Sequence, residues 1–137
     1  MHTAEGLLKV LPGEPKDDDW QQLKAFEAEA DRNGQLEATD ELQSLLRRIA
    51  PTLLIASEDV TDAACSPERL AEIVLEMRRR IREGSRQVMT AFSSAKGLVE
   101  AGRQDEAREL LISTEKATML PFYKEVIRAQ TRAMGLT

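Results

Sequence analysis

The sequence has almost no histidine or cysteine: His2 and Cys65 are the single residues of each type among 137. One cysteine cannot form an internal disulfide or a thiolate metal cluster. With one histidine near the N-terminus, the chain also lacks the Glu-x-x-His pattern of di-iron sites, the His-Glu-x-x-His pattern of zinc enzymes and the histidine of a catalytic triad. No glycine-rich phosphate-binding loop is present. We therefore expect no enzymatic activity, no cofactor and no metal site.

Aromatic residues and long apolar runs are also scarce. Aromatic residues make up 4% of the chain, so the core is predicted to be mainly aliphatic. No apolar run approaches the roughly 18 residues of a membrane span, and the N-terminus lacks the basic start and apolar centre of a signal peptide. A formal net charge of −5 disfavours binding to nucleic acids. These features predict a cytoplasmic protein that binds neither membranes nor nucleic acids.

What is present is one long helical pattern. Ser66 suits the N-cap, Pro67 the first helical position, and Gly102 the left-handed residue that ends a helix. Between them apolar or small residues recur at steps of three and four, which predicts one helix at about residues 67–101. These residues are Leu70, Val74, Met77, Ile81, Gly84, Val88, Ala91 or Phe92, Ala95 and Val99. Gly84 predicts either a bend or a close helix crossing.

Shorter helices are predicted on both sides of the long one. Residues 1–16 contain two prolines and a glycine in four positions and are predicted to form a flexible arm. Residues 17–135 are predicted to form a single helical domain, an all-α bundle of about five or six helices organised on the long helix. The shorter helices run from Asp17 to Asn33, from Asp40 to Ala50, from Ser57 to about Cys65, from the turn after Gly102 to Met119, and from Pro121 to Gly135. Residues 52–55 are an apolar crossing, either extended or a turn.

Acidic residues are plentiful but lack the setting of a catalytic or metal site. Asp17–Asp19 open a predicted helix, where capping and the helix dipole explain three carboxylates. Acids such as Glu27, Glu29 and Asp31 fall on the polar face of that helix, whereas acid–base catalysis needs a carboxyl whose pKa is shifted by burial. Cys65 lies at a helix junction and is interpreted as a small buried hydrophobic residue rather than a redox thiol.

The most informative polar feature is a group of five arginines within nine positions of the long helix. Glu76 is four residues before Arg80, and Arg79 is four residues before Glu83. Acids and bases at this spacing lie on the same helix face and stabilise the helix by about 0.3 kcal/mol per pair. We therefore predict that two of the five arginines pair within the helix.

The other three arginines, Arg78, Arg82 and Arg86, follow one another at steps of four, and we call them the arginine stripe. No acid lies at the favoured spacing from them, and like charges so placed repel, so a partner is expected. One interpretation, which we favour, is pairing with acids of the first helices, including Asp17–Asp19 or Glu37. The other is an external partner, either an acidic protein or a phosphate group, which suits the planar fork of arginine.

Several stretches resemble the DUSAM-domain family, a set of small myxobacterial paralogues. They are DWQQLKAFEAEADRNGQLEATDELQSLLRR, IASEDVTDA, RRRIREGSRQ, GRQDEARELL and LPFYKEV. They cover most of the chain, from about Asp19 to Arg132, and the IREGSR segment is the most specific of them. The resemblance implies a helical domain in a bacterial protein. The family's function is uncharacterised, so the resemblance assigns no catalytic residue, and residues 1–16 lie outside the resembling region.

Taken together, these features predict a non-enzymatic protein-interaction module, a small cytosolic regulator, adaptor or inhibitor of a larger partner protein. The candidate binding residues are Arg78, Arg82 and Arg86. The alternative is a sensor that binds a small anionic or nucleotide ligand at the same arginine stripe. A DNA-binding helix-turn-helix in the first three helices is disfavoured, because residues 17–65 carry more acidic than basic residues. The oligomeric state is open, and a homodimer formed through Leu7–Leu11 or through the bundle is one possibility.

Overall fold

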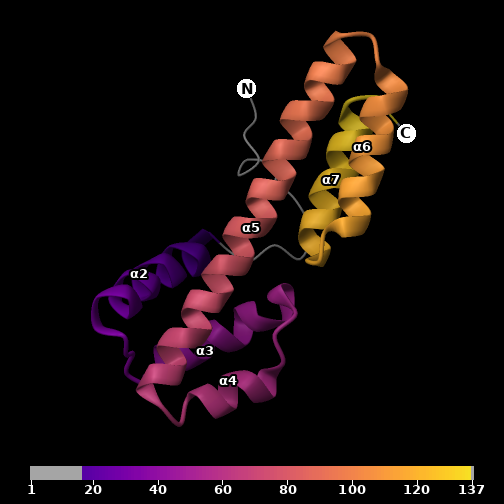
Figure 1. Cartoon of the computed structure of the whole chain (residues 1–137). Helices are drawn as coiled ribbons and strands as arrows, with labels where there is room; N and C mark the ends of the chain where they lie inside the picture. Colours follow the sequence, from indigo (N-terminus) through magenta and orange to yellow (C-terminus); the bar gives the residue numbers. More distant parts are fainter. Residues whose placement is uncertain (1–16, 137) are drawn as a thin grey trace. The chain divides into compact units, whose positions relative to one another are not determined.

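The computed structural model describes residues 17–136, and the predicted arm at residues 1–16 lies outside them. Within that range the backbone forms six α-helices, one short 3₁₀ helix and no strand. The all-α prediction and the long helix, α5 (Pro67–Glu100), are therefore confirmed (Figure 1). The described chain divides into two compact units, whose boundary falls within α5 between Arg82 and Glu83. The assignment of residues 17–135 to a single domain stays a prediction.

The N-terminal unit, residues 17–82, packs three helices around the first half of α5 (Figure 1). They are α2 (Asp17–Asn33), α3 (Asp40–Ile49) and α4 (Ser57–Ala63). The core of this unit is aliphatic, as the composition predicts. Its fully buried side chains include Leu23, Leu36, Leu42, Leu45, Leu46, Ile49, Leu53, Val60, Leu70, Val74 and Met77. The backbone N–H of Leu36 donates to the carbonyl of Pro67 at 3.0 Å, which ties the loop after α2 to the start of α5.

Local capping explains where these helices begin and end. The Thr39 hydroxyl accepts from the backbone N–H of Leu42 at 3.1 Å and caps α3. Ser66 accepts from the N–H of Arg69 at 3.4 Å and caps α5, so the predicted N-cap is confirmed. Gly34 follows α2 with φ +67°, the left-handed conformation in which glycine closes a helix.

The apolar crossing after α3 is a 3₁₀ helix, η1 (Ala50–Leu53), followed by a left-handed residue. Leu54 has φ 59° and ψ 36°, a left-handed conformation that glycine usually adopts. Its side chain is exposed. The N–H of Ile55 donates to the carbonyl of Ala50 at 3.0 Å, which closes the turn. Arg80 donates to the carbonyls of Leu53 at 2.7 Å and Leu54 at 3.3 Å. The crossing is thus a turn rather than an extended segment.

The C-terminal unit consists of the second half of α5 with α6 (Gln104–Ala117) and α7 (Pro121–Ala133). The chain reverses direction twice, so the three helices run antiparallel in sequence order (Figure 1). Gly102, with φ +76°, closes α5 as predicted, and the N–H of Arg103 donates to the carbonyl of Leu98 at 2.8 Å. The buried side chains of the unit include Val88, Ala91, Ala95, Ala107, Leu111, Phe122, Tyr123, Val126 and Ile127.

Gly84 marks a close helix crossing, one of the two alternatives predicted for it. A Cβ atom added to Gly84 would overlap the Cδ2 and Cε2 atoms of the Tyr123 ring, on α7. Tyr123 is almost completely buried, and its ring stacks at a tilt on that of Phe122, with 4.1 Å between the ring centroids. The missing side chain at Gly84 therefore provides the space in which the largest buried side chain of this unit lies.

Candidate functional site

Arg78 and Arg82, the first two residues of the arginine stripe, lie in the part of α5 that belongs to the N-terminal unit. Arg78 is only 9% exposed, and its Nε donates to Oε1 of Glu27 on α2 at 3.1 Å. Arg82 lies one turn further along, and its Nη1 donates to the other carboxylate oxygen of Glu27. The side chain of Arg82 is 57% exposed, whereas that of Glu27 is largely buried. One carboxylate thus bridges two arginines of the stripe and joins α2 to α5.

The acid that pairs with Arg78 and Arg82 belongs to the first helices, as the favoured interpretation predicts, but it is Glu27 and not one of the acids named for that role, Asp17–Asp19 or Glu37. Asp19 pairs with Arg48 at 3.0 Å instead. The sequence pattern predicts that Glu27 lies on the polar face of its helix, but its side chain is largely buried. It lies four residues after Leu23 and three before Ala30, and both are buried. The position of Glu27 at the edge of the apolar face of α2 is the signal in the sequence that indicates a partly buried carboxylate.

The two arginines lower the pKa of Glu27. Burial raises the pKa of this carboxyl, but the hydrogen bonds from Arg82 and Arg78 act in the opposite direction and prevail, so the pKa lies below its usual value of 4.5. Glu27 therefore remains ionised at neutral pH. Its carboxylate and the guanidinium groups of Arg78 and Arg82 form a cluster of one negative and two positive charges.

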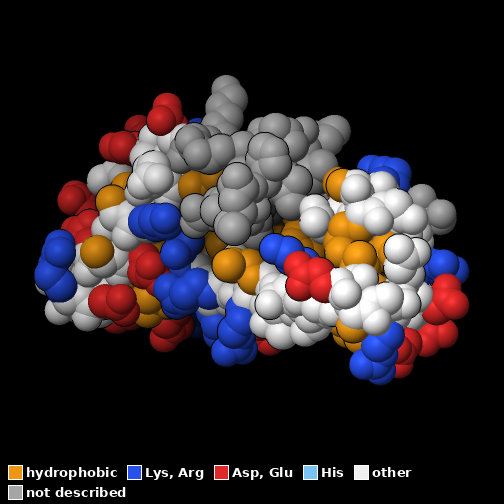
Figure 2. All heavy atoms as spheres, turned by 90° about the horizontal axis from the view of Figure 1, so that it is seen from above, with side chains coloured by type: hydrophobic (Ala, Val, Ile, Leu, Met, Phe, Trp, Pro, Cys, Tyr) orange, Lys and Arg blue, Asp and Glu red, His pale blue; other side chains and the backbone are white. Residues whose placement is uncertain are grey.

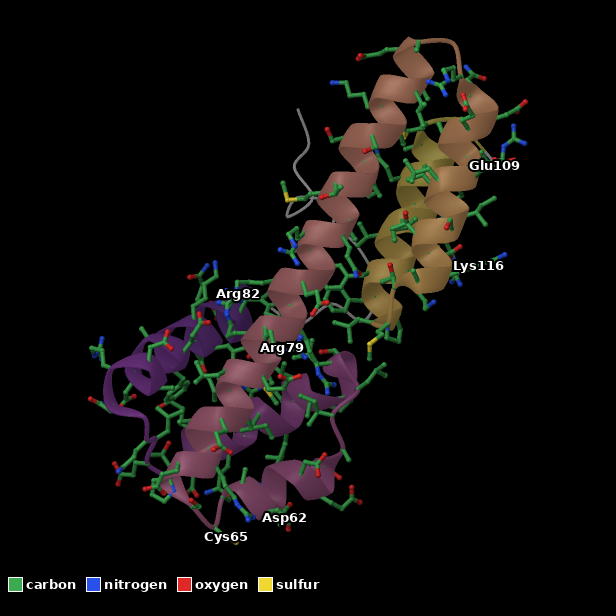
Figure 3. The ribbon with its side chains drawn as sticks, viewed as in Figure 1. Asp62, Cys65, Arg79, Arg82, Glu109 and Lys116 are labelled. Atoms are coloured by element: carbon green, nitrogen blue, oxygen red, sulfur yellow. The ribbon has the colours of Figure 1, made fainter. Side chains whose placement is uncertain are left out.

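A second ion cluster lies beside the first, within α5. Glu76 accepts from Arg79 at 2.6 Å and from Arg80 at 3.0 Å, so the predicted Glu76–Arg80 pair is confirmed. The hydrogen bond from Arg79 is the largest cause that lowers the pKa of Glu76, to about 2. Figure 3 shows Arg79 and Arg82 on neighbouring turns of the helix. Through its contacts with η1, Arg80 connects this cluster to the turn at Leu54.

Arg86, the third residue of the stripe, belongs to the C-terminal unit and differs from the other two. Its side chain is exposed, and it makes no hydrogen bond or ion pair with any residue from 17 to 136. Elsewhere on the surface, basic and acidic side chains often lie side by side, as Figure 2 shows for one face. Arg128, for example, pairs with both Glu115 and Glu125. Arg86 is thus the stripe residue whose charge stays uncompensated in the described part of the chain.

Other residues singled out in the sequence lie apart from the stripe. Cys65 is exposed at the turn between α4 and α5, near Asp62 (Figure 3), so its interpretation as a buried hydrophobic residue is wrong. Over residues 17–136, His, Cys, Asp and Glu side chains do not come together in any group of three that could hold a metal ion. None of the described helices is long and apolar enough to cross a membrane.

Comparison with known proteins places the chain in a family. The model of the family described as "Protein of unknown function (DUF2379)" matches residues 18–134, which include all the described helices except the first residue of α2. The match leaves residues 1–16 outside, as the resemblance in the sequence implied. Searches of curated proteins and of solved structures found no match. The chain therefore belongs to the DUF2379 family, which is the DUSAM-domain family that its sequence resembles.

Proposed function

We propose that the protein is a non-enzymatic interaction module, a small cytosolic regulator or adaptor that binds a larger partner protein. The observation that supports this proposal most is the exposed surface of α5 at Arg86. Arg86 has no ion partner among the described residues, and Met89, on the next turn, is 54% exposed. Arginine and methionine are both enriched at protein interfaces relative to the rest of the surface, and arginine is one of the residues that contribute most to binding there.

The geometry gives the three stripe residues different roles in this proposal. Arg78 is buried in its pair with Glu27, so its role is to hold α2 against α5. Arg82 shares the same carboxylate but is more than half exposed, so it remains accessible to a partner. Arg86 alone has its full hydrogen-bonding capacity available, and we assign the main contact to it.

The alternative function, a sensor for a small anionic or nucleotide ligand, has less support. The carboxylate of Glu27 already lies between Arg78 and Arg82, where a phosphate group would have to bind. A ligand would therefore have to displace a partly buried carboxylate, which costs the ion pairs that the carboxylate makes.

The proposal is tested by affinity purification from the native cell, with wild-type protein and an Arg86→Glu variant side by side. A stoichiometric partner protein should be present with the wild type and lost with the variant, while circular dichroism shows unchanged helix content. Arg132→Glu is the matched control, because Arg132 is an exposed arginine of the same unit without an ion pair in the described chain. A partner retained equally by Arg86→Glu, or lost equally with Arg132→Glu, contradicts the proposed surface.

A further inference from the structure

One face of α5 in the C-terminal unit is exposed along three turns. Arg86, Met89, Ser93 and Lys96 follow one another at steps of three, four and three, which places them on one side of the helix. All four are exposed, whereas Val88, Ala91 and Ala95, on the opposite side, are buried in the unit. We call the four exposed residues the cationic face.

The cationic face is positively charged without local compensation. Between Glu83 and Glu100 the chain contains no aspartate or glutamate, so no acid lies on these turns of the helix. Arg86 and Lys96 form no ion pair with the described residues. They are ten positions apart, about 15 Å along the helix axis. In a chain of net charge −5, this face is a local region of opposite sign.

Met89 lies between the two cations and is the apolar element of the face. It is one of four large hydrophobic side chains that are exposed among the described residues. A methionine side chain is unbranched and adapts its shape to the surface that it contacts. Ser93 follows it with a short side chain, so a partner can approach the helix between Met89 and Lys96.

From these observations we propose that the cationic face binds an acidic amphipathic helix of a partner protein. The apolar side chains of that helix would pack on Met89, and carboxylates about three turns apart would pair with Arg86 and Lys96. The inference rests on the proposed function and adds the chemistry of the partner to it. Two cations about 15 Å apart suit a pair of carboxylates, whereas a nucleic acid or an anionic membrane presents a dense array of charges that the acidic remainder of the chain would repel.

The test uses methyl NMR of the full chain with ¹³C-labelled methionine. The probe is a synthetic helical peptide with leucines along one face and glutamates about three turns apart beside them. The Met89 methyl signal should shift on titration. The Met119 signal should not shift, because Met119 lies at the turn between α6 and α7 and not on the cationic face, although it is 68% exposed. A double variant, Arg86→Glu with Lys96→Glu, should bind at least about tenfold more weakly. It should instead bind a matched peptide with lysines in place of the glutamates.

Several results overturn the inference. They are an unshifted Met89 signal, an equal shift of Met119, and equal binding of the acidic and lysine peptides to the wild type. A Met89 shift caused by anionic vesicles, by duplex DNA or by protein concentration alone also overturns it, since the occupant would then be a membrane, a nucleic acid or a second copy of the chain. If the acidic peptide does not bind but a cellular partner still requires Arg86, this inference is refuted and the proposed function is not. Peptide binding without such a partner refutes the proposed function.

Discussion

Gly84 and Gly97 lie on the same helix, α5, and in the same unit, but their surroundings are opposite. Gly84 is buried, and a Cβ atom there would overlap the ring of Tyr123. Gly97 is exposed, and a Cβ atom there would meet no described atom within 4 Å. The fold therefore needs glycine at position 84 for packing, whereas at position 97 glycine brings only its poor helix propensity.

The same substitution at these two positions should change stability in opposite directions. Gly84→Ala should lower the free energy of unfolding by about 1–3 kcal/mol, because the Tyr123 ring cannot move within a packed core without cost. Gly97→Ala should raise it by about 0.5–1 kcal/mol, because alanine is the better helix former. Urea unfolding followed by circular dichroism measures both. Changes of the same sign would show that the Gly84–Tyr123 contact does not control packing.

The sequence identifies Gly84 as a special position but not the residue that fills the space beside it. The 3.6-residue periodicity of α7 predicts a buried face of Phe122, Val126, Ile127 and Ala129 or Ala133; the first three are buried, whereas Ala129 is half-buried and Ala133 is exposed. Tyr123 is buried as well, because α7 buries a broad face against its neighbours. Which aromatic ring lies opposite a glycine depends on how two helices align, and a periodicity within one helix holds no information about that alignment.

The contact of Glu27 with two arginines connects helix α2 to helix α5 within the N-terminal unit. The two arginines differ mainly in burial, since the side chain of Arg78 is 10% exposed and that of Arg82 is 57% exposed. A buried ion pair leaves an uncompensated charge when one partner is removed, whereas an exposed pair contributes little. The two arginines should therefore differ in their importance for stability although they share one carboxylate.

Arg78→Ala should lower the free energy of unfolding by about 2 kcal/mol or more, and Arg82→Ala by less than about 1 kcal/mol. The Arg78 variant leaves Glu27 partly buried with a single, exposed partner. Chemical denaturation of both variants provides the comparison, and Arg69→Ala, an exposed arginine of α5 without an ion pair in the described chain, serves as the reference. Equal losses for Arg78→Ala and Arg82→Ala would mean that burial does not determine the strength of this contact.

The helix boundaries were predictable from the sequence, and the partners of the arginines were not. Thr39, Ser66 and Gly102 act on backbone groups within a few residues, so their roles follow from local sequence. Glu27, by contrast, is 51 residues from Arg78 and 55 from Arg82. Such pairs are set by the packing of α2 on α5. The sequence therefore limited the candidates to acids of the first helices without selecting among them.

The lowered pKa values of Glu27 and Glu76 make the stability of the folded chain depend on pH in the acid range. Both carboxyls have a lower pKa in the folded chain than their usual value of 4.5. As the pH falls below about 5, the unfolded chain therefore binds protons that the folded chain does not bind, and the folded state loses its advantage. The stability contributed by these carboxylates is complete at neutral pH and is lost as the pH falls through the folded-state values.

The free energy of unfolding of the wild type should thus fall between pH 5 and pH 3, and a Glu27→Gln variant should fall less steeply. Urea unfolding at a series of pH values measures the two slopes. Glu72→Gln is the control, because Glu72 is exposed on α5 and makes no ion pair within the described residues. Its slope should match that of the wild type. Parallel curves for Glu27→Gln and the wild type would contradict the assigned role of the carboxylate.

The crossing at Gly84 also determines which alignments of α7 on α5 are possible. Among the buried positions of α5 in the C-terminal unit, Gly84 alone lacks a Cβ atom, so the Tyr123 ring fits at one helical turn only. A slip of one turn, about 5.4 Å, would bring the ring against Val88. A single missing side chain thus separates the native alignment from its nearest competitors. Placing a second glycine at position 88 should create a conformational isomer that the natural sequence excludes.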